Sequence, residues 1–147
     1  MTSSASPRRV ALFVYGTLLS GEPGHGLLDG AAALGPARTK PAYDLFDLGP
    51  YPALVEGGAT AIVGEVVEVT MPMLAALDLH EEVPRLFQRR PIDLDNGRRV
   101  DAYLLEREQV RGRRRIRSGD WRARFQAERA PGARDSAMVS WLRKRER

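Results

Sequence analysis

The sequence predicts a protein of the α+β class, in which short strands pack with a few short helices. Three observations support this prediction. Residues 10–15 form an apolar run rich in β-branched and aromatic side chains, and residues 59–69 alternate between apolar and mixed faces. Two further strand-like runs, 87–94 and 99–105, flank Asp95-Asn96-Gly97, a strong turn signal for an antiparallel hairpin.

Between the first two strands, the sequence alternates loop-like and structured stretches. Gly16 ends the first strand, and residues 20–26 are too rich in Gly and Pro for regular structure, so we expect a flexible loop there. Residues 27–34 fit a short helix or a packed turn, and residues 37–48 fit a second strand region. The Gly-Pro-Tyr-Pro segment at 49–52 then forms a stiff, extended wall.

One short helix follows the alternating strand. Thr70 is a suitable N-cap, Pro72 falls in the first turn where proline is tolerated, and Val83-Pro84 ends the helical pattern. Glu81 and Glu82 therefore lie near the helix C-terminus, where the macrodipole disfavours an anion. Burial would raise the pKa of either carboxyl further, as a proton shuttle near neutral pH requires.

The 147 residues are enough for one domain with a core. We assign the domain to residues 10–125, after a disordered N-terminus at 1–9 and before a basic C-terminal extension at 126–147 that contains a short helix. Within the domain, Trp121 is large enough to close one end of a small barrel.

Composition argues against several classes of function. There are no cysteines and only His25 and His80, so neither a thiolate zinc site nor a His-based metal site is expected. No apolar run approaches the ~20 residues that span a bilayer. Residues 1–6 lack the apolar segment of a signal peptide, so a cytoplasmic location is expected.

The basic character of the chain does not point to nucleic acid. Its pI is about 9.9, but nearly all of its basic residues are arginines, many of them in the stretch at 111–117. That stretch lacks interleaved aromatic residues and matches no recognition module, so we interpret it as a solvated loop and expect no specific nucleic-acid partner. Arg89 and Arg90 could pair with the acidic cluster at the helix end, but we expect them to face water.

The turn after the first strand is the best candidate for a binding site. Gly16 lets a ligand approach the bare peptide, and the amides of Thr17 and Leu18 follow at once, so several N–H groups can face one anion. A carboxylate is the ligand that such a concavity fits. The plainer interpretation of these residues alone is a strand that ends in a glycine turn.

Five stretches of the sequence, in order, resemble the γ-glutamylcyclotransferase-like (AIG2-like) family. They are Val14-Tyr15-Gly16-Thr17-Leu18, the Asp47–Leu54 segment DLGPYPAL, Gly64-Glu65-Val66, the Leu77–Pro84 segment LDLHEEVP, and Ser118-Gly119-Asp120-Trp121. The resemblance covers about residues 10–125. It implies a small mixed β-barrel and a cofactor-free reaction on a small-molecule γ-glutamyl substrate: the α-amine attacks its own γ-carbonyl, which releases 5-oxoproline and an amine or amino acid.

The same resemblance assigns roles to residues. Leu77 and Asp78 set the register of the family's helix-end pattern, and the catalytic carboxylate then falls on Glu81, with Glu82 as the alternative. Asp78 is expected to brace the helix. The resemblance implies a substrate-binding set made of Tyr15, Gly16, Thr17 and Leu18, with Tyr51 and Pro52 as a wall.

The chain also departs from the family's pattern. His80 stands where an aromatic residue is common, Phe87 where tyrosine is frequent, Gly24 where asparagine is frequent, and Glu82 where a small residue is usual. These departures affect the expected substrate more than the reaction. Two alternatives stay open: a binding module that keeps the pocket without turnover, and a nucleic-acid-binding protein that uses the arginine-rich loop.

Overall fold

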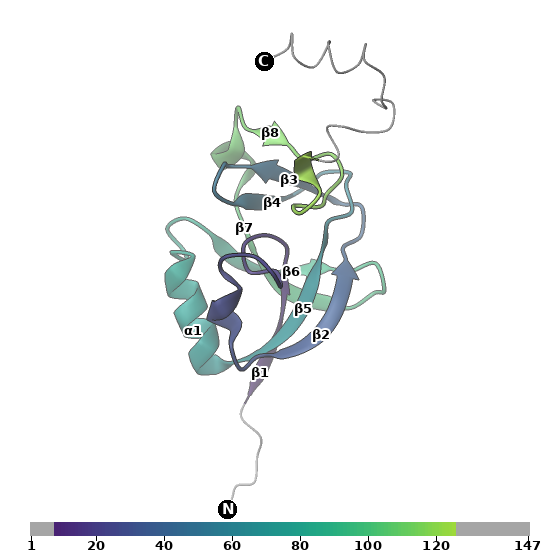
Figure 1. Ribbon diagram of the computed structural model, residues 1–147. Helices are drawn as coiled ribbons and strands as arrows, with labels where there is room; N and C mark the ends of the chain where they lie inside the picture. Colours follow the sequence, from purple (N-terminus) through teal and green to yellow (C-terminus); the bar gives the residue numbers. More distant parts are fainter. Residues whose placement is uncertain (1–7, 126–147) are drawn as a thin grey trace, which may run out of the picture.

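The computed structural model describes residues 8–125, which form one eight-stranded mixed sheet with one α-helix and two 3-10 helices (Figure 1). The elements are β1 (Arg9–Val14), η1 (His25–Leu28), β2 (Ala32–Arg38), β3 (Tyr43–Asp47), β4 (Pro52–Glu56), β5 (Val63–Thr70), α1 (Met71–His80), β6 (Gln88–Asp93), β7 (Arg99–Leu104), η2 (Arg107–Val110) and β8 (Arg114–Arg115). The expected α+β class is confirmed. The expectations for residues 1–7 and 126–147, including the terminal helix, lie outside the described residues.

Five of the strands close into a small barrel. Their order is β2-β5-β1-β7, and β6 pairs with the other edge of β7. The ends of β2 and β6 then meet, because the Lys40 amide donates to the Asp93 carbonyl at 3.0 Å and the Asp95 amide donates to the Arg38 carbonyl at 2.8 Å. Closure leaves no long unpaired edge between these strands.

The remaining strands branch from β7. β1 and β4 both pair with β7 in parallel, β1 through Leu12 and Asp101 and β4 through Leu54 and Leu104. β3 and β8 then extend the sheet beyond β4. The point where β1 ends and β4 takes its place beside β7 is a fork in the sheet, and the chain that leaves β1 at this fork carries Tyr15 and Gly16.

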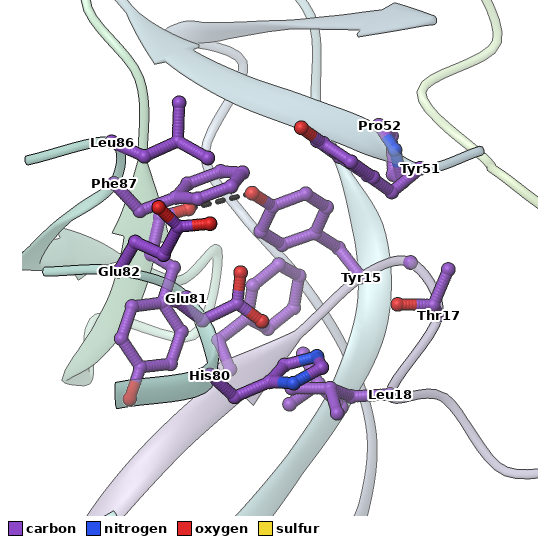
Figure 2. Close-up of a pocket in the computed structure, with 14 residues that line it drawn as sticks. Tyr15, Thr17, Leu18, Tyr51, Pro52, His80, Glu81, Glu82, Leu86 and Phe87 are labelled. Carbon is purple, nitrogen blue, oxygen red and sulfur yellow. Dashed lines mark hydrogen bonds between the residues drawn. The ribbon is translucent and has the colours of Figure 1, made fainter. Parts of the chain in front are cut away.

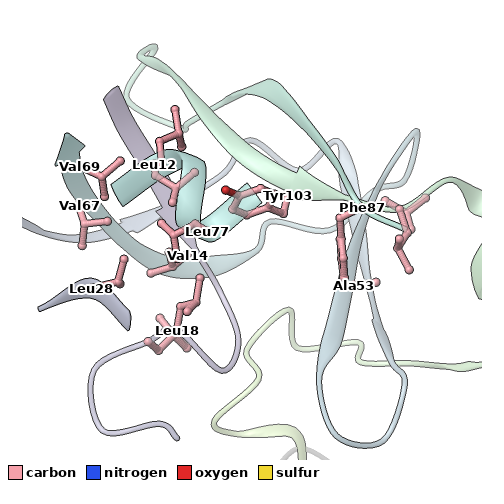
Figure 3. Close-up of a cluster of buried hydrophobic side chains, with 14 of the residues drawn as sticks. Leu12, Val14, Leu18, Leu28, Ala53, Val67, Val69, Leu77, Phe87 and Tyr103 are labelled. Carbon is pink, nitrogen blue, oxygen red and sulfur yellow. The ribbon is translucent and has the colours of Figure 1, made fainter. Parts of the chain in front are cut away.

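Apolar residues on the two faces of the strands form two cores. On β1, Leu12 and Val14 belong to a cluster with Leu74 and Leu77 of α1, so this face is covered by the helix (Figure 3). Because side chains alternate along a strand, Phe13 points to the opposite face, where it packs in a second cluster with Trp121. Trp121 is only 2% exposed, in line with its expected place in the barrel core.

Helix α1 begins and ends close to the predicted positions. The Thr70 hydroxyl accepts a hydrogen bond from the Met73 amide at 3.4 Å, and Pro72 lies in the first turn. At the other end, the Glu81 amide donates to the Leu77 carbonyl at 2.8 Å and the Val83 amide to the Asp78 carbonyl at 2.9 Å. Glu81 is therefore fixed at the end of a helix whose buried face is anchored in the core.

Several expected elements differ from the structure. The strand region expected over 37–48 is divided into the end of β2 and all of β3. The short helix or packed turn expected over 27–34 is the end of η1, a turn and the start of β2. β4 and β8 were not predicted. β4 begins at Pro52, because a strand can accept a proline as its first residue.

Candidate active site

A pocket of about 230 Å³ lies at the fork between β1 and β4. It brings together all the residues predicted for the site, namely Glu81, Tyr15, Gly16, Thr17, Leu18, Tyr51 and Pro52 (Figure 2). Segments far apart in the sequence supply these residues: the turn after β1, the start of β4 and the end of α1. The pocket also includes Phe87 and Tyr103. The sequence analysis did not assign Tyr103 to the site.

The turn after β1 borders the pocket with its backbone. In the described part of the chain, no backbone hydrogen bond occupies the amides of Thr17 and Leu18, whereas the Leu19 amide donates to the Gly16 carbonyl at 3.0 Å. Gly16 is required by packing, since a Cβ there would lie 2.5 Å from Pro52 Cγ. The turn therefore offers N–H groups to an anion at the place where only glycine fits against β4.

Side-chain contacts hold the loop that follows this turn. The Glu65 carboxylate accepts hydrogen bonds from the Ser20 amide at 3.0 Å and the Ser20 hydroxyl at 2.7 Å, and it pairs with Arg122 at 3.1 Å. The Trp121 indole N–H donates to Glu22 Oε1 at 3.3 Å. The loop at 20–26 was expected to be flexible, but residues from β5 and from the end of the domain fix it beside the pocket.

The Tyr15 hydroxyl fills the fork between the strands. It donates to the Tyr103 carbonyl oxygen at 2.6 Å and accepts from the Leu54 amide at 3.2 Å, so it links β7 to β4 (Figure 2). Burial raises the pKa of Tyr15 far above its usual value, and the nearby Glu81 charge acts in the same direction. Tyr15 is therefore a neutral structural link here, not an acid or a base.

Glu81 has the environment of a proton shuttle. Its side chain is half-buried and directed into the pocket on the side of Tyr15 (Figure 2). Burial raises the pKa of the Glu81 carboxyl to about 7. A carboxyl with this pKa exchanges a proton readily near neutral pH in either direction.

Glu82 lines the same pocket as Glu81 but differs from it in exposure and in backbone conformation. Its side chain is 44% exposed and forms an ion pair with Arg85. Its backbone φ is 57°, in the left-handed region that favours glycine. Of the two carboxyls, Glu81 is therefore the more buried one.

An ion-pair network supports the pocket wall from behind. Arg89 donates to both carboxylate oxygens of Asp78, at 2.9 and 3.2 Å, and to Asp101 at 2.9 Å. The Tyr103 hydroxyl donates to the same Asp78 at 2.7 Å. The expectation that Arg89 faces water is wrong, because two carboxylates on α1 and β7 converge on its guanidinium. Asp78 contacts β6 and β7 in this way, which fits its expected bracing role.

The residues that depart from the family's pattern lie in or near the pocket. Phe87 is buried in its wall with its ring centroid 5.9 Å from that of Tyr51, and His80 lines the rim. His25 Nδ1 lies 2.9 Å from the Leu18 carbonyl oxygen, and the Gly24 amide donates to the Thr17 carbonyl at 2.8 Å. Both loop residues therefore shape the binding turn without lining the pocket.

The arginine-rich stretch lies on the other side of the β3–β4 arm. Arg114 and Arg115 form β8 beside β3, where Arg114 pairs with Asp47 at 2.7 Å and Arg115 with Asp44 at 3.3 Å. The whole stretch was expected to be a solvated loop. This expectation is wrong for its central part, which is a strand whose two guanidinium groups form ion pairs with carboxylates of the neighbouring strand.

Two searches of the described residues bear on metals and membranes. Across residues 8–125, no group of three or more His, Cys, Asp or Glu side chains is arranged to hold a metal ion. None of the helices in this range has the length and apolarity needed to cross a membrane.

Comparisons with known proteins show the family of this chain. The family model described as "Gamma-glutamyl cyclotransferase, AIG2-like" matches residues 12–123. A Vibrio cholerae protein named provisionally as a gamma-glutamylcyclotransferase is 43% identical over 111 residues, which cover 75% of this chain and 93% of that protein. A gamma-glutamylaminecyclotransferase of Bos taurus is 41% identical over 97 residues, covering 60% of this chain and 58% of that protein.

A solved structure shows the same fold. The crystal structure of c4763, a uropathogenic E. coli-specific protein, superposes with a TM-score of 0.72 at 23% identity, covering 82% of this chain and 97% of that one. This likeness concerns the fold alone. Because the family model spans most of the sequence, the chain belongs to the gamma-glutamyl cyclotransferase, AIG2-like family, and it is an enzyme of that class.

Proposed function

We propose that this protein converts γ-glutamyl amides to 5-oxoproline and a free amine or amino acid, with Glu81 as the proton shuttle and without a cofactor. The observation that carries the proposal is the position of Glu81: a half-buried carboxyl with a pKa of about 7, in one pocket with an anion-binding turn. The substrate class comes from the family to which the chain belongs.

The turn after β1 holds the substrate in this proposal. The α-carboxylate of the γ-glutamyl group binds at the amides of Thr17 and Leu18, which are not occupied by backbone hydrogen bonds in the described part of the chain. The γ-carbonyl then lies deeper in the pocket, toward Glu81. Since both reacting groups belong to one molecule, holding the chain folded supplies a large part of the rate.

Glu81 then moves one proton. The α-amine nitrogen attacks the γ-carbonyl carbon and forms the ring C–N bond, while the ionised Glu81 carboxylate takes a proton from that nitrogen. The same proton passes to the leaving nitrogen, the original amide C–N bond breaks, and Glu81 is again ionised. A carboxyl with a pKa near 7 suits both steps, because it is neither too weak a base to accept the proton nor too weak an acid to return it.

The experiment is a product assay. Purified protein is incubated with a panel of γ-glutamyl peptides, alkylamides and isopeptides, and 5-oxoproline and the released amine are quantified by mass spectrometry. Wild type is compared with E81Q and with E108Q, a matched control in which an exposed glutamate far from the pocket loses its charge. We expect equimolar products with wild type and E108Q, and loss of at least about a hundredfold in rate with E81Q.

Two outcomes would contradict this proposal. If no compound is turned over while 5-oxoproline binds the folded protein, the pocket belongs to a binding module that lacks turnover. If E81Q retains the wild-type rate, Glu81 is not the shuttle.

A further inference from the structure

Acidic side chains outnumber basic ones in the lining of the pocket, where His80 is the one basic residue among the described residues. Two carboxylates, those of Glu81 and Glu82, line it, and its lining residues, all within the described part of the chain, include no lysine or arginine. Glu81 is the proton shuttle of the proposed function, so its charge serves the reacting nitrogen. The Glu82 charge is left without a role in that reaction, although Glu82 borders the same cavity (Figure 2).

The backbone brings Glu82 to the pocket at a cost. Its φ of 57° is one that a residue with a side chain adopts only with about 1 kcal/mol or more of strain, and glycine would adopt it freely. Hydrogen bonds fix the turn on both sides, from the Glu82 amide to the Leu79 carbonyl at 3.1 Å and from the Leu86 amide to the Glu82 carbonyl at 2.8 Å. A strained residue at the rim of a functional pocket is a recurring sign of function.

The Glu82 carboxylate is paired with the guanidinium of Arg85, and this ion pair is weak. The Arg85 side chain is 81% exposed and does not line the pocket. Ion pairs with this exposure contribute about 0.2–1 kcal/mol, so a second cation in the pocket competes with Arg85 on nearly equal terms.

Apolar and aromatic side chains line the same pocket as Glu82, and Leu86 and Phe87 lie beside it (Figure 2). Tyr51, Leu86 and Phe87 belong to this lining, and the Tyr51 and Phe87 ring centroids are 5.9 Å apart. The carbon atoms of these side chains offer a surface for methylene groups. An alkyl chain that leaves the reacting amide along this surface stays in the pocket that Glu82 also lines.

We propose that Glu82 makes the enzyme selective for γ-glutamyl amides whose leaving amine carries a second positive charge at the end of a short alkyl chain. This inference rests on the proposed function and names its substrate class as γ-glutamyl diamines. The methylene chain lies on Tyr51, Leu86 and Phe87, and the distal ammonium pairs with Glu82. A leaving group that ends in a carboxylate is disfavoured, because it meets that same negative charge.

Three substrates that differ only in the distal group test the selectivity. The first is the γ-glutamyl amide of a four-carbon diamine, the second that of pentylamine, in which a methyl group replaces the ammonium, and the third that of an amino acid of matched length whose carboxylate takes the same place. We measure kcat/KM for each with wild type, E82Q and R85Q. Wild type is expected to prefer the cationic substrate over the neutral one, and the neutral one over the anionic one.

The two variants are expected to change the preference in opposite directions. E82Q removes the partner of the distal ammonium, so the cationic-to-neutral ratio of kcat/KM falls by about two- to fivefold. R85Q removes the competitor, so the same ratio rises by a similar factor. A purely structural role for the Glu82–Arg85 pair would move both variants the same way. The wild-type ratio is also expected to shrink at high ionic strength, and that of E82Q is not.

A glycine variant controls for loss of stability at position 82. E82G suits the positive φ and removes the carboxylate, so it is expected to be as stable as wild type and to lose the selectivity as E82Q does. The inference is overturned, and the proposed function kept, if wild type turns over all three substrates equally or if E82Q and R85Q shift the ratio in the same direction. If wild type releases 5-oxoproline from none of the three, nor from any member of the wider panel, both are overturned.

Discussion

Tyr15 and Tyr103 are joined by a hydrogen bond of 2.6 Å from the hydroxyl of the first to the carbonyl oxygen of the second. The same hydroxyl accepts from the Leu54 amide, so a single side chain satisfies two backbone groups where β1 and β4 part beside β7. The pocket opens at this point in the sheet. Tyr15 therefore links the fold to the site.

Removing this hydroxyl is expected to destabilise the protein. Y15F leaves a buried carbonyl and a buried amide without their partner, which costs about 1–3 kcal/mol in the free energy of unfolding. Urea denaturation measures this loss. Y51F is the matched control, because no hydrogen bond of the Tyr51 hydroxyl occurs within residues 8–125, and we expect a change within about 0.5 kcal/mol. Equal stability of Y15F and wild type would contradict the role given to the link.

Gly16 is expected to tolerate no side chain. In G16A the new Cβ would lie 2.5 Å from Pro52 Cγ and 2.6 Å from Cδ, so the turn must move away from β4. We expect a loss of about 1–3 kcal/mol in stability, together with a raised KM for γ-glutamyl substrates because the binding amides shift. In G26A, by contrast, the Cβ meets no atom within 4 Å, and its stability and KM should match those of wild type. An unchanged KM in G16A would contradict the proposed role of this turn in substrate binding.

The ion pairs of Arg89 are expected to contribute more to the free energy of unfolding than those of its neighbour Arg90. R89M leaves Asp78 and Asp101 half-buried without their cation, at a cost of about 2–4 kcal/mol in unfolding free energy. R90M removes only the more exposed pairs with Glu56 and Glu106, and about 1 kcal/mol or less is expected. Urea denaturation of R89M and R90M measures both losses of unfolding free energy. Equal losses would contradict the larger contribution expected of the Arg89 ion pairs.

The raised pKa of Glu81 makes stability depend on pH in a direction that can be worked out. The pKa of Glu81 is about 7 in the folded state and has its ordinary value of 4.5 in the unfolded state, so the folded state binds more protons between these two pH values. The contribution of the Glu81 carboxyl to the free energy of unfolding is fully present below pH 4.5 and is lost as the pH rises toward 7. For a half-buried carboxyl we expect a loss of about 2 kcal/mol in total.

E81Q does not titrate and therefore lacks this loss. Its unfolding free energy relative to wild type should rise between pH 5 and pH 8 by about 2 kcal/mol, whereas E108Q should follow wild type at every pH. Parallel curves for E81Q and wild type would show that the Glu81 pKa is ordinary.

Local signals were sufficient to predict where helix α1 ends, next to Glu81. Thr70 and Pro72 mark the start of α1, and the predicted helix end places Glu81 where the structure has it. The hairpin of β6 and β7 also follows from its Asn-Gly turn. Each of these features depends on residues close together in the sequence, so local propensity decides it.

Features that depend on distant pairing were not predicted. The prolines at 50 and 52 indicate a stiff wall at 49–52 and give no sign of the strand β4 that begins there. Its strand character comes from pairing with β3 and with Leu104 of β7. Arg89 carries no local sign of its partners: Asp78 and Asp101 come from α1 and β7, and only the folded barrel brings them together. Tyr103 was missed as a site residue for the same reason, since its neighbours in the pocket follow β1 and α1.

The pH dependence of kcat/KM tests the central claim most directly. With a γ-glutamyl substrate that wild type turns over, the rate should rise as Glu81 ionises, on a limb with an apparent pKa near 7, and E81Q should lose both the limb and the activity. A limb at the ordinary carboxyl value of about 4.3, or an E81Q variant as active as wild type, would contradict the assignment of Glu81 as the proton shuttle.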